Sequence, residues 1–268
     1  MHRFFCTVFC QFSFCFTLLL AHSAQEPEWG GAYATFSGPG SIRGNPAGLG
    51  LQEQVSFAFH GKFILGLPEL PFTAVALLVP MQGFVAGMAL SHAGGQWFRE
   101  TSACLSAGRR IGKHWFWGGG IGLQTGFHPQ WNPFLQQILW RTGGMFLHGK
   151  RWRSGITLYG TIPPSKERAR GIRPDLGFRA GLSYRTEEFL LMGECILERL
   201  HALAWMAGIS CVPFPSFFVC CSVGTGTVRQ SAGLGFQQSH WLAGLFVKRS
   251  QFPECIPEIY IEYTFRSK

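Results

Sequence analysis

The chain has 268 residues, long enough for one large domain, and it carries a formal net charge of +9 with only 14% charged residues. Soluble domains usually contain about 25% charged residues, so the composition argues against an ordinary soluble domain. Beyond the first twenty-odd positions, no stretch offers the roughly 20 apolar residues of a membrane-spanning helix, which excludes a helical membrane protein.

Residues 1–24 have the three parts of a secretory signal peptide: a basic start at His2-Arg3, an apolar stretch and a small-residue end. We expect cleavage after Ser23 or Ala24, with retention as a membrane anchor as the alternative. The basic residues of the exported part lie mostly in or beside predicted tight turns. We therefore expect them to contact water or anionic lipid headgroups, and we expect no nucleic-acid partner.

A two-residue rhythm follows the signal peptide, and residues 175–184 show it clearly. Leu176, Phe178 and Leu182 alternate there with small or polar residues. Successive side chains of a β-strand point to opposite faces, so this segment has one apolar face. About fourteen such segments follow one another along the chain. The predicted strands are 53–60, 71–79, 82–92, 96–107, 113–125, 136–148, 151–160, 174–184, 188–197, 202–211, 216–225, 228–237, 240–248 and 257–266.

In lipid, only helices and closed barrels satisfy every backbone hydrogen bond. We therefore predict an all-β fold, an antiparallel transmembrane β-barrel of about 14 strands. The connections support an even strand number, because every even-to-odd connection is short. The long connections are all odd-to-even and cover 61–70, 126–135, 161–173 and 249–256.

The alternation also assigns the two faces of each strand. The residues predicted to face lipid in strands 113–125 and 228–237 are Trp115, Trp117, Ile121, Leu123, Ala232, Leu234 and Phe236. The opposite face of both strands is rich in glycine. Glycine on the inner face leaves room for a plug or a ligand, or merely relieves curvature.

Residues 25–52 differ from the barrel segment 53–268, because they show no alternation and are rich in turn residues. This stretch is too long for a plain lead-in, and we predict that it folds inside the barrel as a hatch. It contains Gly-Gly-Ala and, about a dozen residues later, Asn-Pro-Ala-Gly-Leu. The residues of the two motifs are Gly30, Gly31, Ala32, Asn45, Pro46, Ala47, Gly48 and Leu49.

These motifs resemble the start of the FadL-like outer-membrane barrels and are most similar to the PorV/PorQ branch. Residues 231–236 and 259–265 are similar to the last strands of that family. The resemblance implies that Phe265 is the terminal aromatic residue read by barrel-assembly machinery, although three further residues follow it. It also implies a bacterial outer-membrane barrel with a hatch. The implied role is non-enzymatic, in type IX protein secretion or surface export; the alternative is transport of hydrophobic small molecules such as long-chain fatty acids.

Ionisable residues within the strands are expected to point into the lumen, because a lipid-facing Arg or Lys at midplane costs about 2–4 kcal/mol. They serve either as internal ion pairs that hold the hatch or as a polar translocation path. We predict that Arg43 of the hatch pairs with Glu194 or Glu262. The candidate lumen charges are Arg43, Arg179, Glu194, Arg229 and Glu262.

No catalytic, cofactor or metal site is predicted. No His lies near a Ser at a recognisable active-site spacing, and the glycines of 118–122 lie within a strand rather than before a helix. We expect outer-membrane lipid as a partner, together with secretion-system proteins or a hydrophobic ligand, and leave the oligomeric state open. The cysteines that remain after the signal peptide lack metal-type spacing and are expected as unpaired thiols, with a disulfide as the alternative. They are Cys104, Cys195, Cys211, Cys220, Cys221 and Cys255.

Overall fold

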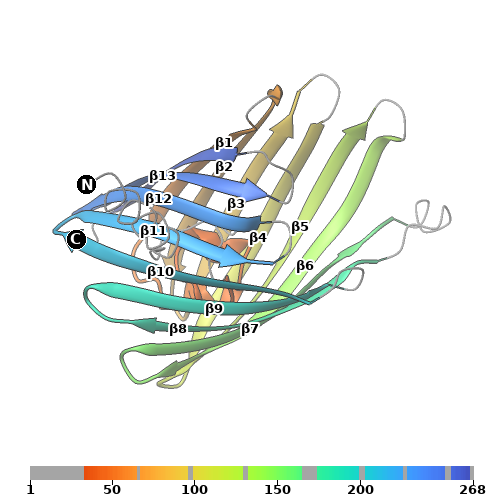
Figure 1. Ribbon diagram of the computed structural model, residues 1–268. Helices are drawn as coiled ribbons and strands as arrows, with labels where there is room; N and C mark the ends of the chain where they lie inside the picture. The colour runs from red at the N-terminus through yellow and green to blue at the C-terminus, as the bar shows by residue number, and fades with distance from the viewer. Residues whose placement is uncertain are drawn as a thin grey trace, which may run out of the picture.

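The computed structural model of the protein describes residues 33–64, 67–95, 99–128, 132–164, 174–198, 203–225, 228–250 and 255–265. The predicted signal peptide and the hatch residues Gly30, Gly31 and Ala32 lie outside these ranges. The described chain forms a closed barrel of fourteen antiparallel strands, in which each strand pairs with its sequence neighbours (Figure 1). The pairing of the last strand with the first, for example Ser56 opposite Thr264, closes the ring. The predicted fold class is confirmed.

The strands run in simple meander order around the ring. Their bounds are β1 Ser56–Ile64, β2 Leu67–Met81, β3 Phe84–Gly94, β4 Arg99–Ile111, β5 Trp115–His128, β6 Asn132–His148, β7 Trp152–Ile162, β8 Leu176–Arg185, β9 Phe189–Glu198, β10 Ala204–Phe214, β11 Phe217–Gly224, β12 Val228–Gln238, β13 Trp241–Ser250 and β14 Cys255–Thr264.

The two ends of the barrel differ in their connections. At one end, here named the turn end, short turns join each even strand to the next odd strand. Gly83, Gly112 and Gly149 have positive φ angles of 85°, 74° and 70° in three of these turns. Glycine adopts this left-handed backbone without steric cost, which explains why these turns are tight. The opposite end, the loop end, joins odd strands to the next even strands.

Two of the predicted long connections are wrong, because the strands extend further toward the loop end than the alternation indicated. β1 and β2 pair as far as Ile64 opposite Leu67, which removes most of the loop predicted over 61–70. β5 and β6 likewise pair to His128 opposite Asn132, with a register shift just before that pair. Prolines and glycines in these segments mimic loop composition, but a bulge or an unpaired backbone position accommodates them within a strand.

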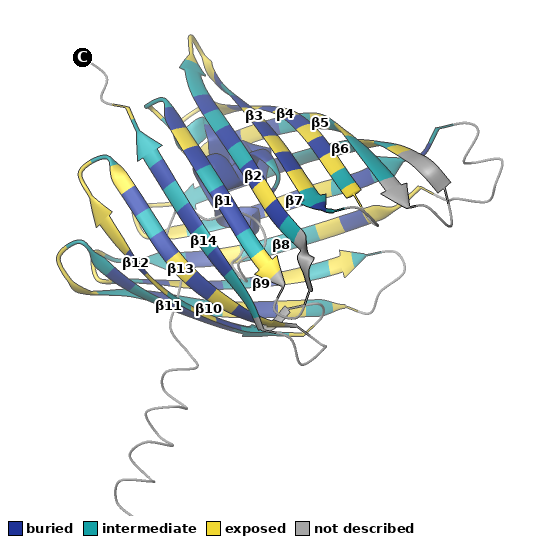
Figure 2. Cartoon of the chain, turned by 90° about the horizontal axis from the view of Figure 1, so that it is seen from above, coloured by how far each residue is buried: buried dark blue, intermediate teal, exposed yellow. Residues whose placement is uncertain are grey.

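The outer face of the barrel is an apolar band. Trp115, Trp117 and Ile121 of β5 expose 59%, 54% and 66% of their surface, whereas Phe116 between them exposes only 3%. β12 shows the same alternation, with Leu234 and Phe236 exposed. Figure 2 shows buried and exposed residues alternating along most strands. The predicted lipid-facing residues of both strands are therefore confirmed as outward-facing. Among the described residues, no helix is both long and apolar enough to cross a membrane.

Aromatic pairs collect at the turn end of the band. Trp115, Trp152 and Trp241 each begin a strand there, and each packs tilted against an aromatic ring of the neighbouring strand at 4.6–4.7 Å between centroids. Trp241 pairs with Tyr263, whose ring in turn lies 4.8 Å from that of Phe265. Rings of this kind mark the membrane–water interface of outer-membrane barrels. Recognition of Phe265 by assembly machinery stays a prediction.

We predict that Ile121→Arg, which places a charge on the outer face in the middle of β5, lowers the free energy of unfolding in lipid vesicles by about 2–4 kcal/mol. The matched control is Gln124→Arg on the same strand, because Gln124 lines an internal cavity. Urea titrations followed by tryptophan fluorescence measure both variants. Equal losses for the two variants would contradict the assignment of faces.

Candidate functional site in the barrel lumen

The N-terminal segment, defined here as residues 33–52, lies inside the barrel and is almost entirely buried (Figure 1). It consists of three short 3₁₀ helices: η1 Tyr33–Thr35, η2 Pro39–Ile42 and η3 Pro46–Leu51. Pro39 and Pro46 begin two of them, where the missing N–H of proline costs no hydrogen bond. Asn45 caps η3, because its side-chain oxygen accepts a bond from the Ala47 N–H at 3.1 Å.

Glycines of the barrel wall make room for this segment. A Cβ atom at Gly118 of β5 would collide with the backbone of Pro46, and one at Gly108 of β4 would meet the same carbonyl. Gly143 and Gly155, on β6 and β7, face Asn45 and the Ala34 carbonyl in the same way. Inward glycines on four neighbouring strands therefore form a groove whose depth matches the backbone of the segment.

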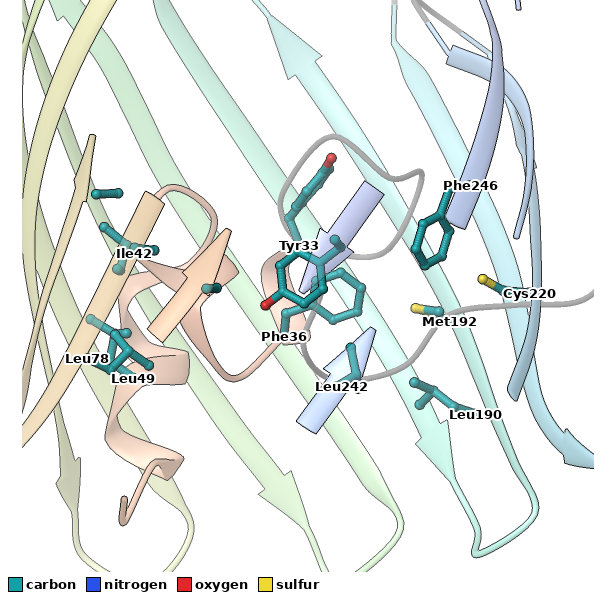
Figure 3. Packing of buried hydrophobic residues seen from close by; sticks show 14 of the residues in the cluster. Tyr33, Phe36, Ile42, Leu49, Leu78, Leu190, Met192, Cys220, Leu242 and Phe246 are labelled. Atoms are coloured by element: carbon teal, nitrogen blue, oxygen red, sulfur yellow. The ribbon is translucent and has the colours of Figure 1, made fainter. Parts of the chain in front are cut away.

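Side chains of the segment and the wall form a mixed core across the lumen. Figure 3 shows Ile42 and Leu49 beside Leu78 of β2, while Tyr33 and Phe36 lie nearer Leu242 of β13. The Tyr33 and Phe36 rings meet edge to face at 6.1 Å. Burial of these residues favours the docked position of the segment, because each buried apolar side chain contributes about 1.5–3 kcal/mol.

Polar groups of the segment find partners on β4 and β6. The Asn45 amide nitrogen donates to the carbonyl oxygens of Ala34 and Gly144, at 2.7 and 3.1 Å. The Ser106 hydroxyl donates to the Ile42 carbonyl at 2.8 Å. Buried backbone groups require such partners, so these bonds fix the height of the segment in the lumen.

Glu194 and Arg179, two of the predicted lumen charges, meet at the beginning of the segment. The Glu194 carboxylate is 3% exposed and accepts a hydrogen bond from the Tyr33 N–H at 2.7 Å. The Arg179 guanidinium lies 4.6 Å from the centre of the Tyr33 ring and donates to the Tyr159 hydroxyl at 3.3 Å. These two residues of β8 and β9 therefore contact both the backbone and the side chain of Tyr33.

The predicted ion pair between Arg43 and Glu194 or Glu262 is wrong. The Arg43 guanidinium donates instead to the hydroxyls of Ser91 and Ser102, at 2.5 and 2.6 Å. The position of the segment explains this difference. Because η2 and η3 pack on β3, β4 and β5, the Arg43 side chain points toward that part of the wall. Glu262 on β14 accepts a bond from the Tyr260 hydroxyl at 2.8 Å. The side chain of the remaining candidate, Arg229, lies outside the described residues.

Sequence reasoning missed a second charged group that joins β1, β13 and β14. The Lys248 ammonium lies 3.0 Å from Glu258, and the His60 ring nitrogen lies 3.4 Å from the same carboxylate. All three side chains are buried. A signal was available, because Glu258 has the same strand parity as the inward residues Tyr260 and Glu262. Its position near a predicted strand end concealed it, since charges there usually contact water.

A cavity of about 490 Å³ occupies the lumen between the N-terminal segment and the loop end. Five cationic side chains and two carboxylates line it, so its wall is electropositive. An apolar part of the wall includes Leu139, Ile196 and Met206. The cationic residues are Arg43, Lys62, Arg141, Arg179 and Lys248, and the carboxylates are those of Glu100 and Glu258.

Four cysteines of the described residues are free thiols. Cys104 lines the cavity as a free thiol, and Cys195, Cys211 and Cys220 are free as well. The side chain of Cys255 lies outside the described residues.

No protein-family model and no curated protein matches this chain. The barrel is nevertheless similar to solved structures of the FadL type. The "CymD monoaromatic hydrocarbon channel" has a TM-score of 0.65 at 11% identity, covering 92% of this chain and 100% of that chain. The Pseudomonas putida toluene transporter TodX has a TM-score of 0.60 at 9% identity, covering 92% of this chain and 97% of that chain. A Pseudomonas aeruginosa FadL homologue has a TM-score of 0.57 at 10% identity, covering 93% of this chain and 100% of that chain.

At such low identity these likenesses show the fold alone. The structural neighbours are FadL-family outer-membrane barrels, and they give no support for the PorV/PorQ branch. CymD is described as a channel and TodX as a transporter.

We predict that Gly118→Val displaces the N-terminal segment, because its side chain would occupy the space of Pro46 and Ala47. Overpacking of this kind costs about 1–3 kcal/mol, so the melting temperature should fall and trypsin should cut after Arg43. The control is Gly119→Val, the next residue of the same strand, where a Cβ meets only the Arg141 carbonyl at 3.8 Å. Equal melting temperatures and equal trypsin cleavage of the two variants would contradict the role of Gly118 in the groove.

Proposed function

We propose that the protein is an outer-membrane channel for small molecules, and that its N-terminal segment is the inner part of a hatch formed by residues 25–52. The observation that carries this proposal is the arrangement along the lumen. A cavity lies toward the loop end, and a buried segment fills the barrel below it. The apolar outer band supports a membrane location, since a closed barrel is one of the two backbone solutions that lipid permits.

A transport role is better supported than a role in secretion. The similar structures include proteins described as a monoaromatic hydrocarbon channel and a toluene transporter. The passage of hydrophobic small molecules, the alternative drawn from the sequence, agrees with these descriptions. The secretion role implied by the PorV/PorQ resemblance has no supporting observation in the lumen or on the described surface.

Passage requires that the hatch moves or that the substrate leaves the lumen beside it. The contacts that hold the segment in place are individually modest, because each neutral hydrogen bond contributes about 0.5–1.5 kcal/mol net. The Glu194 contact with Tyr33 fixes the beginning of the segment, and Asn45 fixes its middle. A local displacement between these two contacts leaves the barrel wall intact, since the strands pair with one another and not with the segment.

The proposal predicts that deletion of residues 33–51 converts a poorly conducting barrel into an open pore. In planar lipid bilayers, the deletion variant should show discrete conductance steps at least several-fold larger than those of the wild type. Cells that carry the wild-type barrel in the outer membrane should also take up labelled small aromatic molecules faster than cells without it.

The control for both measurements is Gly119→Val, which leaves the segment and its groove unchanged. Equal conductance of the wild type and the deletion variant would refute the hatch. Equal uptake of these molecules with and without the protein would refute the transport of small aromatic molecules.

A further inference from the structure

Two arginines of the cavity form no ion pair with a carboxylate among the described residues, although the carboxylate of Glu100 lines the same cavity. Arg43 donates to the hydroxyls of Ser91 and Ser102, and its Nε atom is buried without a hydrogen-bond partner in the described part of the chain. Arg141 donates to the backbone carbonyl of Arg43. Both therefore bind neutral oxygen atoms only, and both line the same cavity.

Another cation of the cavity shows the contrast. Lys248 forms an ion pair with Glu258 at 3.0 Å. Arg43 and Arg141 instead carry like charges in the same cavity, where Arg141 bonds to the Arg43 backbone, so the two guanidinium groups repel each other. A guanidinium group keeps its charge in proteins, and two like charges become more costly as water is excluded. An anion placed between them would offset this repulsion and accept a hydrogen bond from the unpartnered Arg43 Nε.

We propose that the cavity binds a compact organic anion, whose carboxylate or phosphate group is held by Arg43 and Arg141. This inference rests on the proposed transport function and names its substrate class. The serine hydroxyls fix the Arg43 guanidinium on the wall, so the donors are oriented before the anion arrives. Charge-assisted bonds from arginine to an oxyanion are about twice as strong as neutral ones.

The rest of the cavity fits a small apolar body. Leu139, Ile196 and Met206 line it together with the charges, which places an apolar surface within reach of the anion-binding donors. Its volume of about 490 Å³ lies within the range of about 300–1,000 Å³ typical of small-molecule pockets. An aromatic carboxylate combines these properties, whereas a neutral hydrocarbon would leave both guanidinium groups uncompensated.

Titration calorimetry on the purified protein in detergent tests the inference with benzoate and its neutral isostere benzamide. Benzoate should bind at least tenfold more tightly than benzamide, and inorganic phosphate should compete with it. Arg43→Gln should weaken benzoate binding at least tenfold, while Arg43→Lys, which keeps the charge, should retain most of it. Arg109→Gln, on the outer face of β4, removes the same charge outside the lumen and should change nothing.

Arg141→Gln is the second variant, and trypsin digestion checks that the N-terminal segment stays in place when its bond to the Arg43 carbonyl is lost. Equal affinity for benzoate and benzamide, or full benzoate affinity in both glutamine variants, would overturn the inference. Because binding is measured without a membrane, a failure of uptake by cells leaves this result intact. Loss of benzoate binding, in turn, leaves the conductance of the deletion variant unaffected.

Discussion

Closure of the sheet is the constraint on which the other features of this protein depend. The register between β1 and β14 joins residues that are about 200 positions apart in sequence, and it removes the last unpaired strand edge. Once the ring is closed, every strand has one face toward the surroundings and one toward the lumen. Side-chain alternation then separates an apolar outside from a polar inside, without any core-forming segment other than the strands themselves.

The closed ring creates a second requirement, because a lumen of this width must be filled or hydrated. This chain fills part of it with its own N-terminal segment, and wall glycines permit the approach. Gly118 and Gly119 show how local this requirement is. The first faces the segment backbone, and the second faces outward with free space around it. Both are glycine in the same strand, so residue type alone does not reveal which one the packing requires.

The sequence predicted the strands and their faces well, because a period of two is a local property that each segment carries. It predicted the loop lengths poorly, since β1–β2 and β5–β6 contain prolines and glycines that pairing with a neighbour accommodates. The partner of Arg43 was mispredicted for a different reason. Charge complementarity alone predicts Glu194 or Glu262 as the partner. The strands that Arg43 faces, however, depend on where the whole segment docks in the lumen. That position follows from glycines on four strands, which only the three-dimensional register brings together.

The lumen uses its charges in two physically different ways. The Lys248–Glu258–His60 group joins three neighbouring strands, and Glu194 joins the wall to the backbone of the segment, so both have structural partners. Arg43 and Arg141 instead place two like charges in the same cavity without an ion pair to either. A fold shared with hydrocarbon channels does not determine the substrate, because function depends on the residues that line the site. An apolar lining would serve a neutral substrate better, so two arginines without an ion pair in this cavity favour a molecule that carries a negative charge.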